Sequence, residues 1–190
     1  MNRPLDRSFY IPANSTEIVD GDAVAYLYKF DDKVAAMGFY GKTKKPIWHY
    51  RFRNKEDADD HIEKFFKNRQ EHLVRKEVAK QERLSASQEM ADNAKVGDIY
   101  YASWGYNQTN IDFYQILEKK GKMSFMLQKI GSIIAHAERG SDYVMPNPKH
   151  TKGEPMLKRI NAYGFTLNSF ATASPWDGQP KYETAFGYGH

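Results

Sequence analysis

A single segment of helical periodicity, set between two regions of strand-like alternation, most constrains how this chain can fold. Within residues 55–73, apolar side chains recur every three or four positions, which is typical of a helix with one buried face. Before that segment, residues 23–30, 34–40 and 47–53 alternate as half-buried strands do, and short alternating runs return after residue 95. The sequence therefore predicts an α+β protein: an N-terminal antiparallel β-meander, one long helix, and a second β-rich region.

The clearest predicted strand is residues 47–53, which read IWHYRFR. A period of two places Trp48, Tyr50 and Phe52 on one face, and His49, Arg51 and Arg53 on the other. We expect the aromatic face to pack against the apolar stripe of the helix. That stripe consists of Ala58, Ile62, Phe65, Phe66, Leu73 and the alkyl stem of Arg69. Asn54 is predicted to cap the helix, because an asparagine side chain accepts hydrogen bonds from the first helical N–H groups.

The pattern also predicts where the chain divides. The helical stripe weakens after Leu73, and residues 85–95 are polar without a period, so we expect a linker there. The linker would separate a first domain, residues 1–84, from a second domain, residues 96–190. Short strands joined by polar turns in the second domain resemble a small SH3-like β-barrel. A long loop is predicted near residues 131–153, and loops of that length are often functional.

Several classes of chemistry are excluded by residues that the chain lacks. With no cysteine, it has no disulfide, thiolate nucleophile, cysteine-bound zinc or iron–sulfur cluster. It also lacks the glycine-rich phosphate-binding motifs and the G-x-S-x-G turn. A carboxylate pair could come from Asp98, Asp112 and Asp177, but Asp98 and Asp177 adjoin turn glycines, which turn formation explains better. We therefore expect no catalytic residues, metal or cofactor, and a small hydrolase or nuclease without a recognisable motif is the second alternative.

The strongest functional signal is a basic stretch. Residues 33–55 contain seven Lys or Arg and no Asp or Glu, in a basic protein of net charge +4. Cations on a rigid strand beside aromatic rings suit a phosphate backbone with stacked bases. The predicted nucleic-acid-binding residues are Lys42, Lys44, Lys45, His49, Arg51 and Arg53. The competing interpretation is a solvated face, with lysines that discourage edge-to-edge aggregation.

A second candidate is the polar and aromatic cluster at residues 103–110, SWGYNQTN. Such residues can stack on bases and hydrogen-bond their edges, and Trp and Tyr are also enriched in protein-binding hot spots. The predicted partner-binding residues are Trp104, Tyr106, Asn107, Gln108 and Asn110. The competing interpretation is that the aromatic side chains belong to a core and the polar ones form a turn.

The segments GKTKKPIWHYRFR, SWGYNQTNIDFYQ and SPWDGQPKYETAFGYGH together resemble small proteins carried by bacteriophages and plasmids. This resemblance covers most of the chain and carries over no known activity, but it favours a binding role in a host cell. We expect a non-enzymatic protein of a mobile genetic element that contacts nucleic acid or a nucleoprotein through its basic strand. The first alternative is a protein-binding, anti-CRISPR-like inhibitor of a host enzyme or defence complex.

The expected location is the cytoplasm of the bacterial host. Residues 1–6 lack the charged and apolar pattern of a signal peptide. The apolar stretches are a few residues long, whereas a membrane helix needs about 20. We therefore expect no membrane partner, and the sequence leaves the oligomeric state open.

Overall fold

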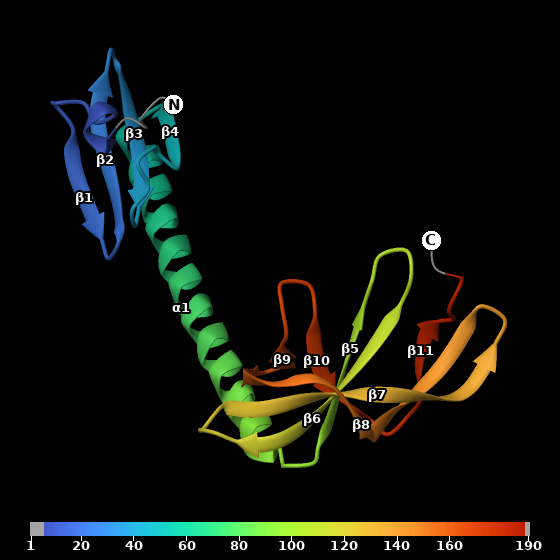
Figure 1. The fold of residues 1–190 in the computed structure, drawn as a ribbon. Coiled ribbons are helices and arrows are strands. Elements are labelled where there is room, and N and C mark those ends of the chain that lie inside the picture. Colours follow the sequence, from blue (N-terminus) through green and yellow to red (C-terminus); the bar gives the residue numbers. More distant parts are fainter. Residues whose placement is uncertain (1–5, 189–190) are drawn as a thin grey trace. The chain divides into compact units, whose positions relative to one another are not determined.

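The protein, in a computed structural model that describes residues 6–188, divides into two compact units, Met1–Val78 and Ala79–His190. Residues 1–5, which carry most of the signal-peptide prediction, and His190 lie outside the described residues. Each unit has its own antiparallel sheet, and the single long helix α1 (Lys55–Asn93) contributes residues to both. Figure 1 shows the elements of each unit. The predicted α+β class with one long helix is confirmed.

The first unit is a four-stranded meander that follows a short 3-10 helix, η1 (Arg7–Phe9). Its strands are β1 (Thr16–Asp20), β2 (Ala23–Phe30), β3 (Lys33–Tyr40) and β4 (Trp48–Phe52), paired in chain order. Cross-strand register places Tyr28 opposite Ala35, and Ala35 opposite Arg51. Because opposed residues of an antiparallel pair point to the same side, this register fixes which residues share each face.

One face of this sheet packs against α1. Its core contains Ala23, Ala25, Ala36, Trp48, Ile62 and Phe66. Small alanines let the helix approach the sheet closely, while Trp48 fills the remaining space. The predicted packing of Trp48 and Phe52 on the helix is confirmed. Tyr50 stacks on Trp48 with ring centroids 5.9 Å apart but is 53% exposed, because β4 is an edge strand that the helix covers only in part.

The opposite face of the first sheet is partly covered by the N-terminal segment. Val24, Met37 and Phe39 are buried there, with Tyr10 and Ile11 packed against them. This second small core leaves the far end of the same face uncovered.

Helix α1 begins as predicted and ends much later than predicted. The Asn54 side chain accepts a hydrogen bond from the Asp57 N–H at 2.7 Å, which confirms the cap. The predicted linker at residues 85–95 is wrong, because α1 continues to Asn93. Ser87 and Ala91 are buried on that last part of α1, Ala94 is buried directly after it, and Ala91 and Ala94 belong to a core of the second unit. The segment reads as a linker in sequence because it is polar without a period, yet its small buried side chains permit close contact with the neighbouring sheet.

The second unit holds a seven-stranded antiparallel sheet in the order β11-β8-β7-β6-β5-β10-β9, and β9 also pairs with β8. The central strands are β5 (Ile99–Trp104), β6 (Asn110–Lys119), β7 (Ser124–Glu138) and β8 (Ser141–Asn161). The short strands are β9 (Gly164–Thr166), β10 (Thr172–Pro175) and β11 (Lys181–Thr184). One core packs the end of α1 against the sheet and contains Tyr114, Phe125, Leu127 and Phe165. A second core contains Phe113, Ile130 and Val144.

The long loop predicted near residues 131–153 is wrong. These residues extend β7 and β8 into a long hairpin whose turn contains Gly140 at φ +80. Backbone pairing continues there although many side chains are exposed and polar, and three register shifts accommodate the irregular sequence. Apolar and polar residues therefore alternate only weakly in this segment, and for that reason the sequence predicted a loop instead of strands. Within residues 6–188, no helix is long and apolar enough to cross a membrane.

Candidate nucleic-acid interface

The uncovered end of the first sheet gathers two of the predicted basic-strand residues with aromatic side chains. Strand register places Phe30 opposite Lys33, Tyr28 level with Arg51, and His49 opposite Met37, all on the face that points away from α1. The N-terminal segment covers this face only near Val24, Met37 and Phe39. We use the name open face for Tyr28, Phe30, Lys33, His49 and Arg51.

Two side-chain contacts organise the open face. The Tyr28 hydroxyl and His49 Nε2 are 2.5 Å apart and hydrogen-bonded. The Arg51 guanidinium lies over the Phe30 ring, 4.1 Å from its centroid, a cation–π geometry that holds the side chain against the sheet. Burial raises the pKa of Tyr28, with the charge of Arg51 acting in the opposite direction, so this hydroxyl keeps its proton near neutral pH. The two contacts thus position a guanidinium and an imidazole beside two aromatic rings.

Arg51 and Arg53 do not lie on the same strand as predicted. Strand β4 ends at Phe52, so Arg53 lies in the bend before α1. Its Nε is 3.4 Å from the Asp57 carboxylate, and its side chain is 93% exposed. Among the described residues, by contrast, Arg51 has no ion pair with a carboxylate. The acidic first turn of α1 therefore attracts Arg53 and leaves Arg51 on the open face.

The predicted lysines Lys42, Lys44 and Lys45 are exposed in the loop between β3 and β4. That loop adjoins the Gly38–Trp48 end of the strand pair, whereas Arg51 lies three pairs further along, opposite Ala35. The lysine loop and Arg51 therefore mark the two ends of β4, and His49 lies between them.

Sequence reasoning missed Arg7, which supports this loop. Its Nη2 donates hydrogen bonds to the carbonyl groups of Gly41 and Thr43, at 3.0 and 2.9 Å, and its Nε donates to Thr43 at 3.1 Å. Its guanidinium also lies 4.9 Å from the Phe39 ring centroid. No local signal could reveal this contact, because Arg7 and Thr43 are 36 residues apart.

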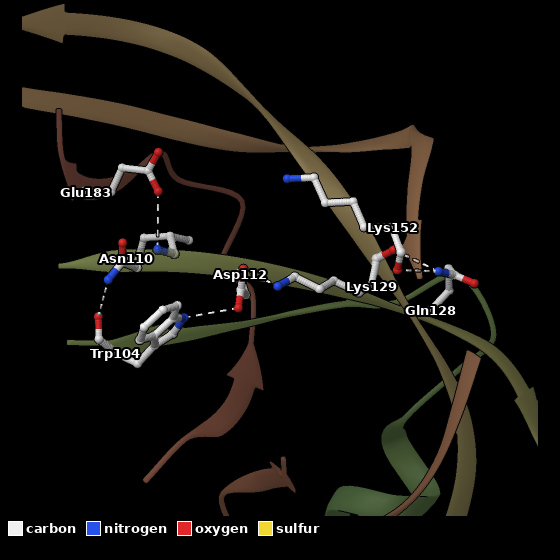
Figure 2. A network of polar contacts seen from close by, with 8 residues as sticks. Trp104, Asn110, Asp112, Gln128, Lys129, Lys152 and Glu183 are labelled. Carbon is white, nitrogen blue, oxygen red and sulfur yellow. Dashed lines mark hydrogen bonds and ion pairs between the residues drawn. The ribbon is translucent and has the colours of Figure 1, made fainter. Parts of the chain in front are cut away.

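The predicted partner-binding loop lies in the second unit and is partly held by its own hydrogen bonds. The indole N–H of Trp104 donates to Asp112 at 3.1 Å, and Asn110 Nδ2 donates to the Trp104 carbonyl at 3.4 Å (Figure 2). Gln108 Nε2 donates to the Asn110 side chain at 3.4 Å. Asn107 is exposed and Tyr106 is fully exposed, whereas Trp104 is 38% exposed. Tyr106 is thus the member of the loop most available to a partner.

Asp112 belongs to a polar network that sequence reasoning did not find (Figure 2). Its second carboxylate oxygen lies 2.7 Å from Lys129 Nζ. The buried Gln128 donates to the carbonyl groups of Lys129, Lys152 and Gly153. Glu183 accepts from the Ile111 N–H at 3.2 Å, and burial raises the pKa of its carboxyl group. These residues come from separate strands, so only the sheet register brings them together.

The other candidate carboxylates form turns, as predicted. Asp98 accepts a hydrogen bond from the Lys95 N–H at 2.8 Å. Asp177 accepts from the Gln179 N–H at 3.0 Å and pairs with Lys181 at 2.7 Å. In the part of the chain that the structure describes, no three His, Cys, Asp or Glu side chains are grouped so that they could hold a metal ion.

No protein-family model matches the chain, and neither the curated proteins nor the solved structures gave a match.

Proposed function

We propose that the first unit binds single-stranded nucleic acid through the open face. The observation that carries this proposal is the Arg51 guanidinium held 4.1 Å from the centroid of the Phe30 ring, at the end of a sheet face that α1 does not cover and that the N-terminal segment covers only near Val24, Met37 and Phe39. A positioned guanidinium meets a phosphate with less loss of side-chain entropy than a mobile lysine.

The spacing on β4 supports a single strand as the ligand. His49 and Arg51 are two residues apart on one strand face, which is about 7 Å along the strand. This is close to the separation of successive phosphates in an extended single strand. The ring of Tyr28 and the Phe30–Arg51 pair offer flat surfaces for base stacking, which is the usual sequence-tolerant contact in single-strand binding. Lys42, Lys44 and Lys45 would extend the positive surface from the other end of β4.

Binding of the full chain to a 3′-labelled 20-nucleotide DNA or RNA, followed by fluorescence anisotropy across a salt series, tests the proposal. Arg51→Gln is expected to weaken binding about tenfold and to reduce the slope of log affinity against log salt by about 0.7, which corresponds to one phosphate contact on a single strand. Lys122→Gln is the matched control, because Lys122 is exposed in a turn of the second unit. Arg53→Gln, which removes a cation already paired with Asp57, should have a smaller effect than Arg51→Gln.

Absence of binding at low salt would refute the proposal, as would equal effects of Arg51→Gln and Lys122→Gln. In that case the protein-binding alternative gains support, since the fully exposed Tyr106 beside Trp104 has the character of a hot-spot side chain. A pull-down from bacterial lysate with and without nuclease separates the two functions, because a direct protein partner survives nuclease treatment.

Three more specific predictions stay part of this proposal. The second unit would be an SH3-like barrel, which the extra pairing of β9 with β8 supports. The protein would belong to a mobile genetic element and act in the bacterial cytoplasm. It would act by binding rather than by catalysis, which an assay for hydrolysis of labelled DNA and RNA would test directly.

A further inference from the structure

A notch at the free end of β2 carries a further inference, which rests on the proposed function. Strand β1 pairs with β2 only as far as Thr16 opposite Leu27. Among the described residues, the part of β2 from Tyr28 to Phe30 therefore has no partner strand on the β1 side. The open strand edge leaves backbone N–H and C=O groups available to a ligand.

The notch contains a cavity of about 440 Å³ with mixed walls. Leu27 and Val34, both half-buried, contribute the apolar part. The polar residues Asn14 and Thr16 and the basic residues Lys29 and Lys55 belong to the same lining. Apolar walls with a few convergent polar groups, in this range of volume, are typical of small-molecule sites.

The charge at this cavity favours an anion. Lys29 has no ion pair among the described residues, and Lys55 pairs only with Asp59, at 2.5 Å, with 69% of its side chain exposed. An exposed pair of this kind contributes little to stability, so Lys55 can exchange its partner at small cost. Two lysines match a terminal phosphate monoester, which carries nearly two negative charges at neutral pH.

The cavity lies at the free edge of β2, with Leu27 and Val34 on the α1 side of the sheet and the open face on the other side. Tyr28 lines the cavity, and its hydroxyl is hydrogen-bonded to His49 on the open face. A strand that crosses the open face and passes around the unpaired edge of β2 can therefore end in the notch. We propose that the notch holds the terminal nucleotide of a bound single strand, with its base against Leu27 and Val34 and its phosphate monoester between Lys29 and Lys55.

The test compares 20-nucleotide strands that differ only in a phosphate at the 5′ or the 3′ end, using the full chain. One phosphorylated strand is expected to bind about tenfold tighter than the unphosphorylated strand. Lys29→Ala combined with Lys55→Ala should abolish this difference while weaker binding of the unphosphorylated strand persists. Lys122→Ala together with Lys120→Ala is the matched control, because both lysines lie in an exposed turn of the second unit, and it should preserve the difference.

The second arm of the test adds adenosine 5′-monophosphate, adenosine or inorganic phosphate to the full chain. Binding is measured from the methyl NMR signals of Leu27 and Val34. These signals are expected to shift far more with the nucleotide than with adenosine or phosphate alone. If phosphorylated and unphosphorylated strands bind equally and the nucleotide shifts nothing, the notch is not a nucleotide site, and binding on the open face stands. If no strand binds while the nucleotide shifts both methyl groups, the notch takes free nucleotides and the proposed function of the open face is wrong.

Discussion

At the scale of single residues, Gly38 shows how one missing side chain shapes the first core. Trp48 lies directly across from it on β4, and a Cβ on Gly38 would approach three atoms of the indole ring closer than 3.0 Å. Among residues 6–188, the buried Trp48 indole N–H has no hydrogen-bond partner, so packing holds the ring there. Gly38→Ala is therefore expected to lower the free energy of unfolding by about 1–3 kcal/mol, the usual cost of overpacking.

Urea denaturation followed by tryptophan fluorescence measures this loss. Gly121→Ala is the matched control, since its added Cβ would be 3.9 Å from the nearest atom and the glycine does not have a positive φ. The control should change stability by less than about 0.5 kcal/mol. Equal stability of Gly38→Ala and the unchanged protein would show that the indole can move aside.

His61 is expected to make the stability of the first unit sensitive to pH. Its ring contacts Trp48, Tyr50 and Phe52, with centroid distances of 4.5, 5.4 and 5.4 Å. Burial, with a smaller contribution from Lys64, lowers the pKa of His61 from its ordinary value of 6.5. Because the folded state disfavours the proton, the stability from neutral His61 is present above about pH 6.5 and is lost as pH falls below it toward the folded pKa.

Unfolding curves at pH 7.5 and pH 5 are expected to show this loss for the unchanged protein. His61→Phe, which keeps an aromatic ring among the same neighbours, should remove most of the difference between the two pH values. His72→Gln changes an exposed histidine of the same helix and should leave the difference in place. Persistence of the full pH dependence in His61→Phe would assign it to other groups.

At the scale of elements, the two ends of α1 are stabilised in different ways. The N-terminal end depends on the local cap, in which Asn54 accepts from the Asp57 N–H. Near the C-terminal end, the Ala91 carbonyl accepts a hydrogen bond at 2.8 Å from Lys119 Nζ, a residue of β6 that is 28 positions away. The first contact is local in sequence and could be predicted, and the second is not.

Asn54→Ala is expected to destabilise the first unit by about 1 kcal/mol, because it leaves an N–H group of the first helical turn without its side-chain acceptor. Asn54→Asp keeps an acceptor and adds negative charge at the helix N-terminus, so it should cost little or nothing. Chemical denaturation of both variants measures the difference. A loss as large in Asn54→Asp as in Asn54→Ala would show that the cap is not the relevant contact.

At the scale of the whole molecule, separate cores predict separable responses. Ile62 is 3% exposed in the core of the first unit, and Phe125 is fully buried in a core of the second. Ile62→Ala is expected to cost about 2–5 kcal/mol and Phe125→Ala about 3–5 kcal/mol, by loss of buried surface and creation of a cavity.

Amide hydrogen exchange locates each loss. Ile62→Ala should speed exchange mainly in β2, β3 and β4, and Phe125→Ala mainly in β5, β6 and β7. Each variant serves as the control for the other. Uniform loss of protection across both units in either variant would mean that the shared helix couples them into one cooperative unit.

The sequence by itself determined those elements whose side chains follow a strong local pattern. Alternation in the first three predicted strands and the apolar stripe that begins at Ala58 gave the meander, the helix start and the packing of Trp48 and Phe52. Each of these depends on periodicity within a few residues, and hydrophobic burial acts on that periodicity directly. The exposure of His49 and Arg51 follows from the same alternation.

Only the tertiary structure decided the features that depend on distant partners. Residues 85–93 are helical because small side chains such as Ala91 fit a core of the second unit, and residues 131–153 are paired because their backbones find each other despite weak alternation. The open face, the Arg7 contact with Thr43 and the notch beside β2 likewise arise where separate segments meet. Such contacts join residues far apart in the chain, so no local pattern of side chains encodes them.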